Sequence, residues 1–117
     1  MIRRRKDTQR PLYLISVVSQ MLEVHPQTLR LYEREGFITP VRINRQRLYS
    51  DMDVQKLHLI IELTRDLGVN RAGVDIILRL RNRLDGLQRV MNEMMSYLDD
   101  DVRQDFERRL RILFSEE

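Results

Sequence analysis

One stretch of the sequence decides the fold: Val24-His25-Pro26-Gln27-Thr28-Leu29-Arg30-Leu31-Tyr32-Glu33-Arg34-Glu35-Gly36-Phe37-Ile38-Thr39-Pro40. Pro26 suits the first position of a helix, because its missing N–H costs nothing there and its fixed φ is already helical. Gly36 can adopt a positive φ and is therefore a good residue to end the helix. The stretch predicts a short helix that begins at Pro26 and stops before Gly36.

This short helix has an apolar inner edge and a polar remainder. Leu29 and Tyr32 fall on the inner face, with Leu31 as a candidate third member. The side chains left to point elsewhere are those of Gln27, Thr28, Arg30, Glu33 and Arg34. A short, sharply ended helix with a polar free face is typical of the recognition helix in a helix-turn-helix, which reads a major groove from its first turns.

The charge of the chain is distributed unevenly. Its 117 residues, enough for one small domain and a helix or two, carry a formal net charge of +3. Residues 1–49 contain ten Lys/Arg and four Asp/Glu, a net +6, whereas residues 50–117 contain eleven and fourteen, a net −3. A basic half that holds the polar helix favours a polyanionic partner.

Several classes of function are not expected from this composition. Without cysteine the chain can form no disulfide framework and no thiolate metal or redox site. Two histidines without a convergent carboxylate cluster do not make a metal site, so neither a metal nor a cofactor is expected. No nucleophile–base pair or phosphate-binding loop can be assembled, so the protein is not expected to be an enzyme.

The segments before the polar helix are expected to be an arm and a first helix. Residues 1–12 are predicted to form a flexible basic arm, which either contacts phosphates or acts as a solubilising tail. Ser16 is expected to cap a helix whose apolar stripe contains Val18, Met21 and Leu22. Glu23 occupies the following turn, where a positive φ is favoured and Glu is strained. His25 is expected to be the N-cap of the polar helix, with a phosphate contact as the alternative.

The segment after the polar helix predicts a β-hairpin and a further helix. Residues 41–49 alternate apolar and polar side chains around Asn44, which fits two short strands joined by a tight turn. Its arginines suggest a wing laid along a phosphate backbone, with a merely solubilising hairpin as the alternative. Ser50, with Asp51 and Asp53 behind it, predicts the start of a helix that Gly68 ends. His58 within that helix is expected to be a partly buried structural residue.

The C-terminal third shows a different apolar period. Asn70 is expected to cap a shorter helix that ends near Leu80. The spacing then becomes 4-3-4-3-4, an a/d heptad seam formed by Leu80, Leu84, Leu87, Met91, Met94 and Leu98. Asp99-Asp100-Asp101 interrupts this seam, and an apolar pattern resumes loosely from Val102. A second copy of the chain is expected to cover the seam, the alternative being that the helix folds back on its own domain.

These expectations define a fold class, which is all-α with a small β-hairpin wing. Residues 13–80 are predicted to form a winged helix-turn-helix DNA-binding domain. Residues 81–117 are predicted to form a coiled-coil dimerisation helix with a C-terminal tail.

The same residues resemble the MerR family of bacterial transcription regulators. Ile15 to Pro40 is similar to the first two helices of that family, and Thr28-Leu29-Arg30 with Tyr32-Glu33-Arg34-Glu35-Gly36 is similar to its recognition-helix signature. Arg47-Leu48-Tyr49-Ser50 is similar to the end of its wing. Within the family the sequence is most similar to that of the repressors of heat-shock chaperone genes. The similarity lies in Ile15-Ser16-Val17 and in residues 25–30. Glu23 and the wing tip at Asn44-Arg45-Gln46 depart from the glycines usual in the family.

The resemblance implies a homodimer with an antiparallel coiled coil that binds an inverted-repeat operator in double-stranded DNA. It implies a repressor of stress genes associated with the bacterial nucleoid, with the chaperone DnaK as a candidate co-repressor. No apolar run approaches the length that spans a bilayer, and no apolar core follows the basic N-terminal residues, so a cytoplasmic protein without a membrane partner is expected. The rival interpretation is an adaptor that keeps a MerR-like helix-turn-helix and binds a co-chaperone instead of DNA. The arginine-rich wing and basic arm favour DNA.

Roles can be assigned to individual residues on this interpretation. Gln27, Thr28 and Arg30 are expected to face the major groove, with Arg30 reaching a guanine edge or a phosphate. Tyr32 and Arg34 are expected to clamp the phosphate backbone. The wing is expected to use Arg42, Arg45, Arg47 and Tyr49. For both tyrosines the alternative is core packing with the hydroxyl at the rim.

Overall fold

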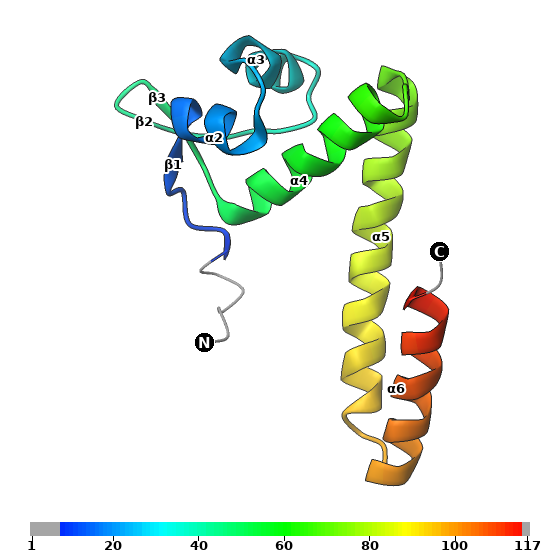
Figure 1. Ribbon diagram of the computed structural model, residues 1–117. Helices are drawn as coiled ribbons and strands as arrows, with labels where there is room; N and C mark the ends of the chain where they lie inside the picture. The colour runs from blue at the N-terminus through cyan, green and yellow to red at the C-terminus, as the bar shows by residue number, and fades with distance from the viewer. Residues whose placement is uncertain (1–7, 116–117) are drawn as a thin grey trace. The chain divides into compact units, whose positions relative to one another are not determined.

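The computed structural model describes residues 8–115, so residues 1–7 of the expected basic arm lie outside the described residues (Figure 1). The chain divides after Ile76 into two compact units, and each is described by itself. The first unit contains β1 (Tyr13–Leu14), α2 (Ile15–Leu22), α3 (Pro26–Arg34), β2 (Val41–Ile43), β3 (Gln46–Tyr49), α4 (Asp51–Ile61), the π-helical turn η1 (Glu62–Asp66) and the start of α5 (Arg71–Met95). The predicted class, a helix-turn-helix with a small sheet and a long helix, is confirmed.

The hairpin predicted over residues 41–49 is present, and a third strand joins it. The sheet is antiparallel in the order β1-β3-β2. Its register pairs Arg42 with Arg47 across the hairpin and Tyr13 with Tyr49 at the other edge of β3. The N–H of Leu12 also donates to the carbonyl of Tyr49 at 3.0 Å. The pairing therefore begins at the last residue of the segment that we expected to be a flexible arm.

The start of α2 differs from the prediction because of this third strand. The helix begins at Ile15 with Leu14 as its N-cap, and no side chain accepts a capping hydrogen bond. Ser16, the expected cap, already lies inside the helix, where its carbonyl accepts a hydrogen bond from Ser19 Oγ at 2.9 Å. Leu14 is held in strand pairing with Leu48, so the chain turns directly from strand to helix and leaves no room for a serine cap.

The two turns that flank α3 have the predicted backbone conformations. Glu23 adopts φ 56° and ψ 44°, a left-handed conformation that a Glu side chain disfavours. Gly36 adopts φ 81°, which glycine tolerates without that penalty. His25 caps α3 as expected, because its Nδ1 accepts a hydrogen bond from the N–H of Gln27 at 3.0 Å.

α4 begins with a reciprocal cap and ends in a wider turn. Asp53 N–H donates to Ser50 Oγ at 3.1 Å, and Ser50 N–H donates to Asp53 Oδ2 at 2.9 Å, a pattern that satisfies two otherwise orphan donors. The helix then continues into η1, where Leu67 N–H donates to Glu62 O at 3.1 Å. Gly68, with φ 66°, ends the run as predicted.

The core of the first unit is made by α2, α3, the segment after α3, β3, α4, η1 and the start of α5. Its buried apolar side chains are Val18, Leu29, Tyr32, Phe37, Ile38, Tyr49, Leu57, Ile60, Ile61, Leu63 and Val74. Leu29 and Tyr32 lie on the inner face of α3 as predicted, whereas Leu31 is 41% exposed. The core therefore holds α3 by one edge and leaves its polar side outside.

The second unit comprises most of α5 and α6 (Asp100–Ser115). Asn70 caps α5 as expected, since its Oδ1 accepts from Gly73 N–H at 2.9 Å. The prediction of a shorter helix ending near Leu80 is wrong, because α5 runs on to Met95 without a proline or cap to stop it. Leu98 lies in the turn at 96–99 rather than on the seam helix, after which the chain reverses direction into α6 (Figure 1).

The aspartates expected only to interrupt the seam in fact start a helix. Asp99 O accepts from Arg103 N–H at 2.8 Å, and Asp100 and Asp101 occupy the first turn of α6, where the helix dipole favours carboxylates. Among residues 8–115, no helix combines the length and apolar character that crossing a membrane requires.

Candidate nucleic-acid interface

The outer side of α3 presents polar side chains from its first turns. Leu29 is fully buried, and Tyr32 is 7% exposed with its ring 6.3 Å from that of Phe37, so the inner edge of the helix is fixed. Gln27 and Arg34 are exposed, and Thr28 and Arg30 are partly exposed. Residues 27, 30 and 34 follow the three- and four-residue spacing of one helix face. The core thus holds in place a face with an amide and two guanidinium groups, and the hydroxyl of Thr28 lies beside this face.

The tip of the hairpin is a strained two-residue turn. Asn44 and Arg45 adopt φ 51° and 68°, the positive values that a type I′ turn requires at both central positions. Asn tolerates this conformation, whereas a long side chain such as that of Arg disfavours it. The Arg45 side chain is exposed at the tip of the hairpin.

The other two arginines of the hairpin are engaged by α3. Arg47 Nε lies 2.6 Å from Glu33 Oε1, and Arg42 Nη2 lies 3.0 Å from Glu33 Oε2. One carboxylate thereby binds both strands of the hairpin to the recognition helix. The side chains of Arg47 and Glu33 are each 23% exposed, while that of Arg42 is 52% exposed.

The ionisation of Glu33 reflects these contacts. Burial by itself raises the pKa of this carboxyl, but the hydrogen bonds and positive charges of Arg47 and Arg42 outweigh it and hold the pKa below its usual value. Glu33 therefore remains a carboxylate at neutral pH. Its contribution to stability is present above its ordinary pKa and is lost as the pH falls through the lowered value.

The structure places both candidate tyrosines in the core. Tyr32 donates to or accepts from Thr64 Oγ1 at 3.1 Å, which ties α3 to η1. Tyr49 is fully buried, and its hydroxyl has no hydrogen-bond partner among the described residues. Burial, followed by the negative charge of Glu33, raises the pKa of Tyr49. The core-packing alternative fits both side chains better than a phosphate clamp does.

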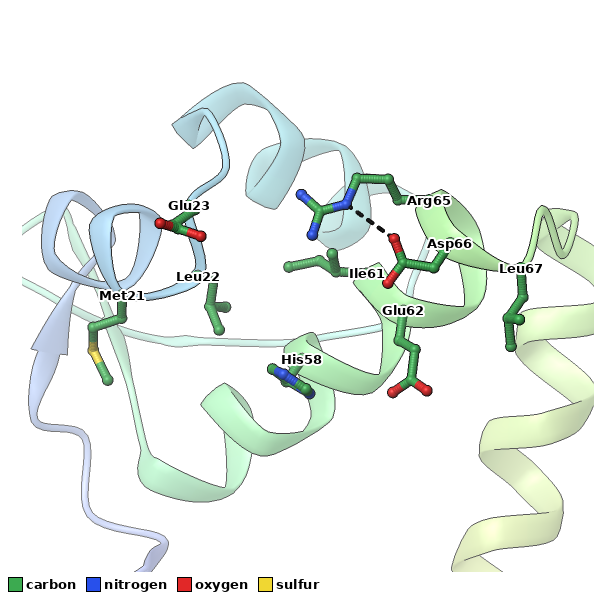
Figure 2. Close-up of a pocket in the computed structure, with 9 residues that line it drawn as sticks. All are labelled: Met21, Leu22, Glu23, His58, Ile61, Glu62, Arg65, Asp66 and Leu67. Carbon is green, nitrogen blue, oxygen red and sulfur yellow. Dashed lines mark hydrogen bonds and ion pairs between the residues drawn. The ribbon is translucent and has the colours of Figure 1, made fainter. Parts of the chain in front are cut away.

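A pocket of about 320 Å³ lies elsewhere in the first unit (Figure 2). It is lined by Met21, Leu22, Glu23, His58, Ile61, Glu62, Arg65, Asp66 and Leu67. The expectation of a partly buried His58 is wrong. The buried face of α4 is formed by Leu57, Ile60 and Ile61, and the side chain of His58 lies outside this face and is exposed. No group of three His, Cys, Asp or Glu side chains within residues 8–115 is arranged to hold a metal ion.

Glu33 is the residue of this surface whose role the sequence-based prediction missed. A signal was present in the hairpin register, because a two-residue turn at 44–45 makes Arg42 and Arg47 direct cross-strand partners. Like charges in that position repel each other, so an anion nearby was to be expected. Which carboxylate supplies it depends on the packing of α3 against the hairpin.

The fold and the polar face of α3 define a helix-turn-helix protein with a β-hairpin wing. The family model for MerR HTH family regulatory proteins matches residues 13–80. This chain belongs to that family.

Similar proteins are named as a heat shock protein and as transcriptional regulators. The Streptomyces coelicolor protein named heat shock protein HspR is 41% identical over 90 residues, a match that covers 76% of this chain and 60% of that protein. The HTH-type transcriptional regulators GlnR of Bacillus anthracis and Bacillus cereus are each 31% identical over 84 residues, covering 71% of this chain and 64% of theirs. The chain thus matches less than two thirds of the length of these relatives.

Proposed function

We propose that this protein is a sequence-specific DNA-binding transcriptional regulator that acts as a homodimer on an inverted-repeat operator. The observation that carries the proposal is the anchored recognition helix, which buries Leu29 and Tyr32 and presents its polar face beside an arginine-tipped hairpin. Membership of the MerR HTH family supports the same function.

The proposed roles of the side chains follow from their places. Gln27, Thr28 and Arg30 enter the major groove, where an amide and a guanidinium can each make paired hydrogen bonds to base edges. Arg34, near the end of α3, and Arg45, at the tip of the wing, bind phosphates and set the position of the protein on the duplex. Tyr32 and Tyr49 support this surface from the core.

The proposed dimer uses the apolar stripe of α5. Leu80, Leu84, Leu87 and Met94 are each more than half exposed, and Met91 is partly exposed. Their a/d spacing matches the seam of a two-stranded coiled coil, and a two-fold dimer presents two recognition helices to two symmetric half-sites. The leucines and methionines of this stripe are therefore assigned to a second copy of the chain.

Repression of stress genes is the finer part of the proposal. It is supported by the similarity to the protein named heat shock protein HspR, which is greater than the similarity to the GlnR regulators. DnaK as co-repressor is proposed on the resemblance alone.

Selection from a random duplex pool with the full chain tests the proposal. We expect enrichment of an inverted repeat that binds at least about 10³ times more tightly than a scrambled duplex of the same composition. Sedimentation at micromolar concentration should show a dimer. Failure to enrich any sequence, or a single-chain species that binds no duplex, would contradict the proposed function.

A further inference from the structure

Glu33 differs from the other charged residues of α3 because its side chain points to the hairpin. Its two carboxylate oxygens contact two different guanidinium groups, that of Arg47 at 2.6 Å and that of Arg42 at 3.0 Å. Each of the two arginines comes from a different strand of the wing. A single side chain therefore connects the recognition helix to both strands.

The strand register explains why a carboxylate belongs there. Arg42 and Arg47 are direct partners across the β2–β3 ladder, so their side chains lie on the same face. Two positive charges in this arrangement repel each other. Glu33 lies within ion-pair distance of both and offsets the repulsion, which holds the wing against α3.

The same contacts reduce the charge that the wing can offer to DNA. An arginine bound to a carboxylate is partly neutralised, and it must break or share that contact to bind a phosphate. Of the three hairpin arginines, Arg45 lies at the tip, away from Glu33 in the turn, and the other two are the partners of Glu33. Phosphate contacts carry no sequence information of their own, so limiting them limits binding to any sequence.

We propose that Glu33 is a positioning and specificity-determining residue, which fixes the wing on the recognition helix and withholds Arg42 and Arg47 from the phosphates of non-cognate DNA. This inference rests on the proposed DNA-binding function and deepens it. The discrimination between sequences then comes from Gln27, Thr28 and Arg30 on α3, because the sequence-independent attraction of the wing is kept small.

The test is the variant Glu33→Gln, which keeps the shape of the side chain and removes its charge. Binding is measured for the selected duplex and for a scrambled duplex over a series of salt concentrations. Each released arginine that reaches a phosphate steepens the slope of log affinity against log salt by about 0.9. We expect the slope on scrambled DNA to steepen by about 1 to 2, and the ratio of selected to scrambled affinity to fall.

A matched control is available two residues further along. Glu35 ion-pairs with Arg71 at the start of α5 and not with the wing, and its side chain is 30% exposed. Glu35→Gln changes the net charge by the same amount and also releases one arginine, so any general effect of charge appears in both variants. Equal slopes for Glu33→Gln and Glu35→Gln would overturn the proposal. So would a loss of affinity for both duplexes by Glu33→Gln without a steeper slope, which is what a purely structural role produces.

A second variant does not depend on how well Glu33→Gln folds. The triple variant Glu33→Gln/Arg42→Gln/Arg47→Gln removes the carboxylate together with the two charges that would otherwise repel each other. If the arginines are withheld in the natural protein, the triple variant should have the natural slope on scrambled DNA. A slope shallower by about 2 would show that both arginines already contact phosphates, and the proposal would be wrong.

The two levels of the proposal fail in different ways. If the natural protein binds no duplex, the proposed function itself fails. If the natural protein prefers its selected duplex and the slopes do not separate as described, only the role of Glu33 is refuted.

Discussion

The two units of the molecule differ in how far their apolar side chains are exposed. In the first unit, Leu29, Leu57 and Ile60 are fully buried, whereas in the second unit Leu84 and Leu87 are 55% and 56% exposed. From Leu80 to Ser115 no side chain is buried. The first unit therefore completes its core with its own residues, while the second leaves apolar area that another surface would have to cover. The difference separates the part that we propose to read DNA from the part that we propose to pair two chains.

The largest expected effect breaks the core of the first unit. Leu29→Ala removes a fully buried side chain from the inner edge of α3 and should lower the free energy of unfolding by about 2–5 kcal/mol. Chemical denaturation measures this change. Leu31→Ala on the same helix is the matched control, because Leu31 is 41% exposed and should cost far less. Similar losses for the two variants would mean that α3 is not anchored by one edge.

The next largest expected effect is on the strength of the proposed dimer, which we assign to the second unit. Leu84→Ala removes one seam position from each copy and should weaken the proposed dimer by about 2–4 kcal/mol. Sedimentation equilibrium measures the association constant. Asn82→Ala, an exposed polar position on the side of the same helix away from the seam, should leave association unchanged. A dimer equally strong in both variants would assign the exposed stripe of α5 to some other contact.

A smaller effect tests the outer face of the first unit. Arg30→Ala should cost about 1–3 kcal/mol on the selected duplex if Arg30 reads a base, and less on scrambled DNA. The control Arg65→Ala removes one positive charge from η1, outside the proposed interface. In the natural protein Arg65 Nε lies 3.5 Å from Asp66 Oδ1. Fluorescence anisotropy titrations compare the two. A uniform loss on both duplexes would make Arg30 a phosphate contact, and no loss would remove it from the interface.

The smallest expected effect comes from replacing Arg45 at the tip of the hairpin, which should stabilise the fold and weaken DNA binding. Arg45 adopts φ 68°, so Arg45→Gly should relieve backbone strain and raise the free energy of unfolding by about 0.5–1 kcal/mol. The same change should weaken binding to every sequence and make the salt slope shallower by about 0.9, because a phosphate contact is lost. Arg45→Ala separates the two effects, since it removes the charge and keeps the strained φ. If Arg45→Gly binds as tightly as the natural protein, the wing tip does not contact DNA.

Local features of the sequence were good predictors of local structure. Pro26 and Gly36 located α3, Ser50 and Asp53 located the start of α4, and Asn44 located the turn of the hairpin. Each signal acts within four residues, through a cap, a fixed φ or a tolerated positive φ. The same kind of signal failed at Ser16, because the pairing of Leu14 with Leu48 set the helix start from a distance.

The sequence by itself determined the helix-turn-helix, the hairpin with its tight turn, and the apolar stripe of the long helix, since all three follow from short-range spacing. Only the tertiary structure decided how the charged and aromatic residues of the surface are used. It brought Glu33 onto Arg42 and Arg47 and buried Tyr49 completely in the core. The two contacts of Glu33 join residues that are 9 and 14 positions apart, so they depend on how α3 packs against the sheet and not on any local pattern.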